Sequence, residues 1–138
     1  MNSAKISAYG IVTILSAMVV FHLLIVTGVI PFNIVWGGRL ETHEQMLGFE
    51  AFSISINVFM IWAVGTYAGL FNFNPNQFFL KGVLWAMVAL FLLNTLGNLA
   101  SANAWEKLIF TPVTLLLSLF SLRLALQRKS SANGVKPL

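Results

Sequence analysis

The chain has 138 residues, enough for one domain, and 58% of them are hydrophobic while only 9% are charged. Soluble domains carry about 25% charged residues, so lipid rather than water must cover most of this surface. The net charge of +4 comes from basic residues at the ends of apolar runs, not along one patch, which excludes a nucleic-acid binder. The absence of cysteine excludes disulfides, thiolate metal sites and cysteine nucleophiles.

Four apolar stretches are long enough to form membrane-spanning helices. A helix needs about 20 mostly apolar residues to cross the hydrocarbon core of a bilayer. The stretches lie at about 6–30, 51–71, 82–98 and 108–126. They predict an all-α integral membrane protein, in which four antiparallel transmembrane helices form one bundle domain over residues 1–126. The first stretch is longer than the roughly 7–15 apolar residues of a signal peptide and lacks a small-residue cleavage site, so we expect it to be retained.

The stretch PFNIVWGGRLETHEQMLGFE, from Pro31 to Glu50, separates the first two spans and holds three of the four acidic residues of the chain. We expect it to touch the membrane interface at Trp36, to bend at the two glycines that follow, and to enter the second helix near Thr42. Thr42 followed by Gln45 is the pattern of a capping box, in which the two side chains satisfy free backbone N–H groups at a helix start.

The distribution of basic residues predicts how the chain is oriented. In a four-helix topology the N-terminus, the second connection and the C-terminus lie on one side of the bilayer. That side holds six basic residues, namely Lys5, Lys81, Arg123, Arg128, Lys129 and Lys136. Only Arg39 and Lys107 lie on the other side. Because positive charge favours the cytoplasmic side, both termini are predicted to be cytoplasmic, including a polar, disordered tail at 127–138. The small size favours a bacterial inner membrane.

Polar residues within the predicted spans gather toward the outer side of the membrane. With about 100° of turn per residue, Glu50 and Asn57 share a face of the second helix with His43, and Asn94 and Asn98 share a face of the third. Such groups are costly in lipid unless they face protein or water. The sequence therefore predicts an outward-facing polar pocket. The residues predicted to bind a ligand there are His22, Arg39, His43, Glu50, Asn57, Asn94 and Asn98.

Glu50 and His22 have the most evident chemical potential in this set. A carboxyl group buried among helices could exchange protons, whereas a carboxyl group in the headgroup region would be solvated or paired with Arg39. His22 stands alone in an apolar helix and could relay protons together with Glu50. The simpler interpretation of His22 is a neutral imidazole hydrogen-bonded to a neighbouring helix. For both residues the sequence leaves the two interpretations open.

The remaining patterns give no metal or cofactor site. His43 lacks the partner of the H-E-x-x-H motif, and the two histidines lie at different depths, which argues against a bis-histidine haem. No nucleotide-binding, nucleophile-elbow or EF-hand pattern occurs. The sequence therefore predicts no metal, no cofactor and no catalytic residue. Arg39 follows two glycines, and we expect it to pair with Glu41, Glu50 or Glu106 and so fold the connection over the mouth of the bundle.

Gly65 and Gly69 form a G-x-x-x-G pair near the end of the second span. Such a pair lets another helix approach closely. Besides the lipid bilayer, the sequence therefore predicts contact through these glycines with either a second copy of the chain or a partner membrane protein.

Three functions fit these features. The first is binding or transport of a small molecule or ion in an outward-facing polar pocket. The second is an accessory or assembly subunit of a larger membrane complex, which the small size and the lack of a soluble domain favour. The third is a small intramembrane enzyme that uses Glu50 and a histidine as acid and base. The few ionisable groups make the enzyme the weakest of the three, so a non-enzymatic role is favoured.

Overall fold

A computed structural model describes residues 3–127 of the chain. Within this range the elements are helices, and no strand is present. They are α1 (Ser3–Val26), η1 (Phe32–Ile34), η2 (Trp36–Gly38), α2 (His43–Tyr67), α3 (Gln77–Leu99) and α4 (Ala104–Ala125), where η marks a single 3₁₀ turn. The four α-helices are each long and apolar enough to cross a membrane, which confirms the predicted all-α class. The tail predicted at 127–138 lies outside the described residues except for Gln127.

The helix boundaries follow local capping chemistry rather than the limits of the apolar runs. As expected, α2 is capped at Thr42, whose side chain accepts a hydrogen bond from the Gln45 N–H at 3.2 Å. The helix therefore begins well before the apolar span at residue 51. In contrast, α1 ends at Val26 rather than at residue 30. The chain turns there because Gly28 adopts a φ of 77°, a left-handed conformation that favours glycine and commonly ends a helix.

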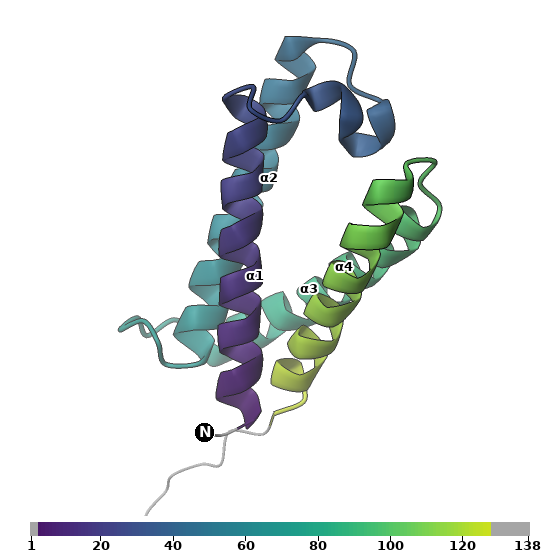
Figure 1. The fold of residues 1–138 in the computed structure, drawn as a ribbon. Coiled ribbons are helices and arrows are strands. Elements are labelled where there is room, and N and C mark those ends of the chain that lie inside the picture. Colours follow the sequence, from purple (N-terminus) through teal and green to yellow (C-terminus); the bar gives the residue numbers. More distant parts are fainter. Residues whose placement is uncertain (1–2, 128–138) are drawn as a thin grey trace, which may run out of the picture.

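The four helices form two antiparallel hairpins, α1 with α2 and α3 with α4 (Figure 1). Smaller contacts of α1 with α4 and of α2 with α3 join the hairpins. The hairpins come together at the end where α1 begins and α4 finishes, here called the terminal end (Figure 1). They stand apart at the opposite end, where residues 27–42 run from α1 toward the second hairpin before returning to α2 (Figure 1). These residues are called the α1–α2 connection below.

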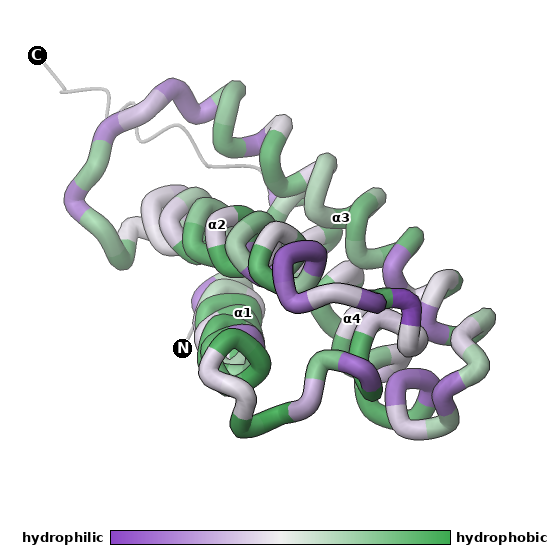
Figure 2. The backbone as a smooth tube through the Cα atoms, turned by 90° about the horizontal axis from the view of Figure 1, so that it is seen from above, coloured by the Kyte–Doolittle hydropathy of each residue, from purple (hydrophilic) through white to green (hydrophobic). Residues whose placement is uncertain are grey.

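Two apolar clusters hold this arrangement together. The larger includes residues of all four helices, such as Ile11, Leu15, Leu84 and Leu124, which are at most 1% exposed. The smaller lies under the α1–α2 connection and consists of Ile25, Val35, Leu40 and Met46. Many large hydrophobic side chains remain exposed on the helices, whereas hydrophilic residues concentrate in the connections (Figure 2). This distribution indicates a multi-pass membrane protein, since lipid can cover such a surface and water cannot.

Of the two glycines in the Gly65-x-x-x-Gly69 pair, Gly65 is already covered by a residue of the same chain. A Cβ atom at Gly65 would overlap the ring of Phe71, which follows the helix and packs back against it. Gly69 lies past the end of α2, has a φ of 74° and has open space around it. An outside helix could therefore reach Gly65 only if Phe71 moved away.

Candidate functional site

His22 of α1 and Glu50 of α2 form a buried pair between the two helices of the first hairpin. The distance from His22 Nδ1 to Glu50 Oε2 is 2.5 Å. Glu50 is fully buried and His22 is 7% exposed. Ile25 and Met46 lie one helical turn from the two residues on the same faces, and their apolar side chains separate the pair from the end of the hairpin. The structure therefore brings together the two residues whose relation the sequence left open.

Trp36 of the α1–α2 connection supplies the second partner of Glu50. Its indole Nε1–H donates a hydrogen bond to Glu50 Oε1 at 2.8 Å. The indole can only donate, so Oε1 acts as an acceptor. At Oε2 the proton lies either on His22 Nδ1, which then donates to a carboxylate, or on the carboxyl group, which then donates to a neutral imidazole. The site can thus hold one proton between two side chains in a nearly dry environment.

The backbone around Trp36 is held in an unusual conformation. Trp36, Gly37 and Gly38 have φ values of 55°, 66° and 70°, so three consecutive residues are left-handed. Glycine adopts this region freely, but a bulky residue there costs about 1–3 kcal/mol. The indole packs edge-on against Phe49, with ring centroids 5.3 Å apart. From this backbone the indole reaches Glu50 and Phe49, while Trp36 as a whole remains 38% exposed.

Residues of the second hairpin hold the connection on both sides of Trp36. The Gly37 N–H donates to Glu106 Oε1 at 2.8 Å, and the Ser101 hydroxyl donates to Glu106 Oε2 at 2.7 Å. Asn103 Nδ2 donates to the backbone oxygen of Ile34 at 2.9 Å. We call the Gly37–Glu106 and Asn103–Ile34 hydrogen bonds the clasp. It closes the connection over the buried pair from a part of the chain that is distant in sequence.

The predicted asparagines do not join the His22–Glu50 pair. Asn57 Nδ2 donates to the backbone oxygen of Ser53 in its own helix at 2.7 Å. Asn98 Nδ2 donates to the Thr114 hydroxyl at 3.4 Å and so belongs to a polar contact between α3 and α4. Asn94 is exposed on the surface of α3. The seven residues predicted to line one pocket are therefore dispersed over several environments.

Arg39 and His43 are both exposed. Among residues 3–127 the single ion pair is that of His22 with Glu50, so Arg39 does not form the expected pair with a glutamate. His43 packs edge-on against Phe32 and borders a cavity of about 430 Å³ at the end of the first hairpin. The cavity is lined by Ile25, Gly28, Ile30, Pro31, Phe32, Asn33, His43 and Met46. Its wall thus includes the same Ile25 and Met46 that cover the buried pair.

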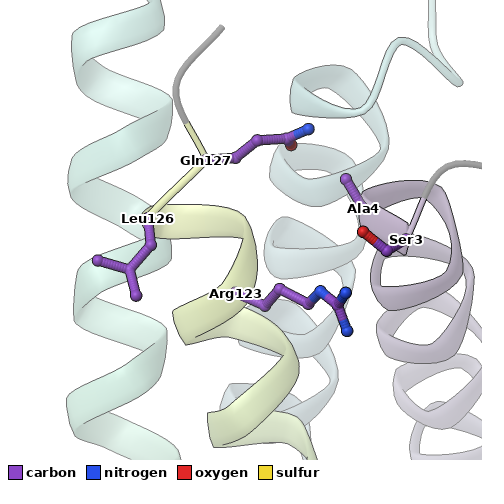
Figure 3. A pocket seen from close by; sticks show the side chains of 5 residues that line it. All are labelled: Ser3, Ala4, Arg123, Leu126 and Gln127. Carbon is purple, nitrogen blue, oxygen red and sulfur yellow. The ribbon is translucent and has the colours of Figure 1, made fainter.

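A second cavity, of about 230 Å³, lies at the terminal end, between the start of α1 and the end of α4, and shares no lining residue with the pair. It is lined by Ser3, Ala4, Arg123, Leu126 and Gln127, and the Arg123 side chain extends toward the start of α1 (Figure 3). Within the part of the chain that the structure describes, no three His, Asp or Glu side chains lie close enough together to hold a metal ion.

Sequence reasoning missed the roles of Trp36 and Glu106. Trp36 was expected at the membrane interface, and Glu106 was considered only as a partner of Arg39. The pair of glycines after Trp36 was the available indication, because consecutive glycines permit the left-handed backbone that turns the indole inward. The contact with Glu106 had no such indication, since it depends on how the hairpins meet.

The fold and this site define a small four-helix protein of the multi-pass membrane class, with a buried His22–Glu50 pair that a partly exposed Trp36 contacts. Comparison of the chain with protein-family models, with curated proteins and with solved structures gives no match.

Proposed function

We propose that the protein binds or transports a small molecule or ion at the end of the bundle that carries the α1–α2 connection, with uptake and release of a proton at the His22–Glu50 pair. The observation that carries this proposal is the full burial of Glu50 against His22 and Trp36. Ionisable residues within membrane spans are expensive and commonly belong to proton or substrate pathways. The clustering of charge at this one place favours a role in function over a role in packing alone.

The cavity beside the pair supports a small amphipathic ligand. Its lining is mainly apolar, and Asn33 and His43 are the two residues in it with polar side chains. Its volume of about 430 Å³ falls within the range of small-molecule sites. Ile25 and Met46 are shared between the cavity and the cover of the pair. A ligand that displaced them would come into direct contact with the His22–Glu50 pair.

The test uses liposomes that contain the purified protein and an imposed pH gradient. Small amphipathic compounds, namely a cation such as tetraphenylphosphonium and neutral aromatic amides, are added in turn while the gradient is followed with a pH-sensitive dye. At least one compound is expected to collapse the gradient with the wild-type protein and not with Glu50→Gln. This variant is well matched, because its amide can accept from Trp36 and donate to His22 but cannot exchange a proton. Wild-type vesicles that behave as empty liposomes with every compound would refute proton-coupled transport.

For orientation we propose that both termini lie in the cytoplasm of a bacterial cell and that the α1–α2 connection faces outward. The support is the excess of Lys and Arg on the side of the termini. The chain has no cysteine, so a single introduced cysteine reports topology directly. We expect Glu44→Cys to react with a membrane-impermeant maleimide added to intact cells. If Glu44→Cys reacts only after the cytoplasmic side is made accessible, the orientation is opposite to the one proposed.

A role as an accessory subunit is the second candidate, and one observation favours it. Asn94 presents its amide on the exposed surface of α3, about one and a half turns before the helix ends at Leu99. An amide that faces hydrocarbon gains from a hydrogen bond to another helix. Gly97, three residues further along the same helix, also has open space around it. If this surface binds a partner, Asn94→Leu should release a stoichiometric subunit that copurifies with the wild type in mild detergent. Purification of the wild type without any second subunit would count against this role.

A further inference from the structure

The site described above is closed by a residue whose conformation depends on a different hairpin. Trp36 covers Glu50 from a connection that is anchored to the start of α2 by Thr42 and to the end of α1 by the turn at Gly28. Neither anchor fixes the left-handed backbone at Trp36. Apart from the bond of the Trp36 side chain to Glu50, the hydrogen bonds that reach this backbone from outside the connection are those of the clasp, at Ile34 on one side and Gly37 on the other.

Glu106 is well placed to set the position of the indole. Its Oε1 accepts directly from the Gly37 N–H, which is the backbone group that follows Trp36. The Ser101 hydroxyl holds the other carboxylate oxygen, so the side chain of Glu106 is fixed at both oxygens. A hydrogen bond to a carboxylate is stronger than one between neutral groups and can offset backbone strain. The left-handed turn at residues 36–38 and the carboxylate at residue 106 therefore stabilise one another.

We propose that Glu106 is a positioning residue, which acts through Gly37 to hold the Trp36 indole on Glu50. It follows that the His22–Glu50 pair stays closed while the second hairpin remains against the α1–α2 connection, and opens when the two separate. The role of this opening in ligand or proton movement rests on the proposed function. The dependence of Glu50 access on Glu106 does not.

The arrangement of the hairpins links their separation to the access of solvent to Glu50. The hairpins are packed together at the terminal end and stand apart at the other end (Figure 1). Toward the open end, the ring contact between Phe21 of α1 and Phe110 of α4, with centroids 5.4 Å apart, precedes the clasp. A small change in the angle between the hairpins would therefore displace the two hairpins most at the clasp. The contacts of the clasp would be the first to break.

The test measures how fast a water-soluble carbodiimide, with glycine ethyl ester as the nucleophile, modifies Glu50 in the purified protein in detergent. Modification is quantified by mass spectrometry as the ratio of Glu50 to the exposed Glu41, which corrects for the activity of the reagent, and circular dichroism of each variant checks that it is folded. Glu106→Ala should raise this ratio about tenfold, the shift expected when one charge-assisted hydrogen bond is lost. Glu106→Gln should raise it less, because its amide oxygen can still accept from Gly37.

Two further variants keep the result decisive. Glu44→Gln is the matched control, since Glu44 is an exposed carboxylate at the same end with no contact to the clasp, and it should leave the ratio unchanged. Asn103→Asp retains the oxygen that caps α4 but loses the donor to Ile34, so it should also raise the ratio. This variant decides the matter if Glu106→Ala does not fold.

The proposal is overturned if Glu106→Ala and Asn103→Asp give the same ratio as Glu44→Gln, or if Glu106→Gln rises as much as Glu106→Ala. Because labelling needs no transported compound, it is separable from the transport assay. Absence of proton-coupled transport together with the expected labelling would refute the proposed function and leave the positioning role of Glu106 in place. Proton-coupled transport without the expected change in labelling would support the proposed function and refute the positioning role of Glu106.

Discussion

At the scale of single residues, the His22–Glu50 pair shows why few ionisable groups occur inside apolar helices. Each carboxyl oxygen of Glu50 has one partner, His22 or Trp36, and the pair is almost sealed from solvent. Removing one member leaves a buried polar group without a partner, whereas replacing both by apolar groups removes the need for partners. Substituting one member of the pair therefore lowers the free energy of unfolding much more than substituting both members by apolar residues.

This reasoning predicts a specific double-mutant result. Glu50→Ala should lower the free energy of unfolding by about 3 kcal/mol, because His22 and Trp36 lose their partner. The double variant His22→Phe with Glu50→Leu should recover at least half of that loss. Unfolding of the detergent-solubilised protein by sodium dodecyl sulfate, followed by circular dichroism, gives both values. If the double variant is as unstable as Glu50→Ala or less stable, the two side chains do not act as a pair.

At the scale of elements, the start of α2 illustrates a helix that continues beyond its apolar span. Thr42 caps the first turn, and Gln45 Oε1 in turn accepts from the Glu41 N–H at 3.0 Å. These bonds satisfy backbone groups that the apolar stretch could not satisfy, so the helix begins at His43.

Loss of this cap should be local and measurable. Thr42→Ala should destabilise the first turn of α2 by about 1 kcal/mol, while Thr42→Ser, which keeps the hydroxyl, should remain close to the wild type. Hydrogen exchange of the Gln45 and Met46 amides is the measurement, since both N–H groups bond to Thr42 and report the opening of that turn. Equal exchange in the Ala and Ser variants would show that the cap contributes nothing to this helix.

At the scale of the whole molecule, the packing of the two hairpins depends on one close approach near the terminal end. A Cβ atom at Gly10 of α1 would come within 2.5 Å of Cε2 in the Phe120 ring of α4. The absence of a side chain at Gly10 thus lets α1 and α4 meet. The same pair of helices meets again at Phe21 and Phe110, closer to the clasp.

A bulky residue at Gly10 should therefore push the hairpins apart. Gly10→Leu is expected to lower the free energy of unfolding by about 1–3 kcal/mol, the usual range for overpacking. Gly82→Leu is the control, because Gly82 lies in α3 with no neighbour near its Cβ position, and it should not destabilise the protein. Thermal denaturation in the same detergent compares the two. If both variants melt alike, Gly10 is not the point where the hairpins pack.

The sequence by itself determined the membrane class, the four apolar helices and the cap at Thr42. These features depend on composition and on interactions between neighbours in the chain, which a single sequence contains. It also singled out His22 and Glu50, because ionisable residues are conspicuous among hydrocarbon side chains. It did not show that the seven predicted ligand-binding residues lie in different environments. Residues that share the polar face of a helix need not share a pocket, because each can bond to its own backbone, as Asn57 does.

Only the tertiary structure decided what Glu50 faces. The sequence allowed water, Arg39, a ligand or His22, and the structure places His22 and Trp36 against the carboxyl group. The Trp36 contact arises from a left-handed turn that a carboxylate 70 residues away in the chain (106 − 36) stabilises through Gly37. Such a contact depends on the angle between two hairpins. That angle is set by the packing of side chains in three dimensions, and no local pattern of residues encodes it.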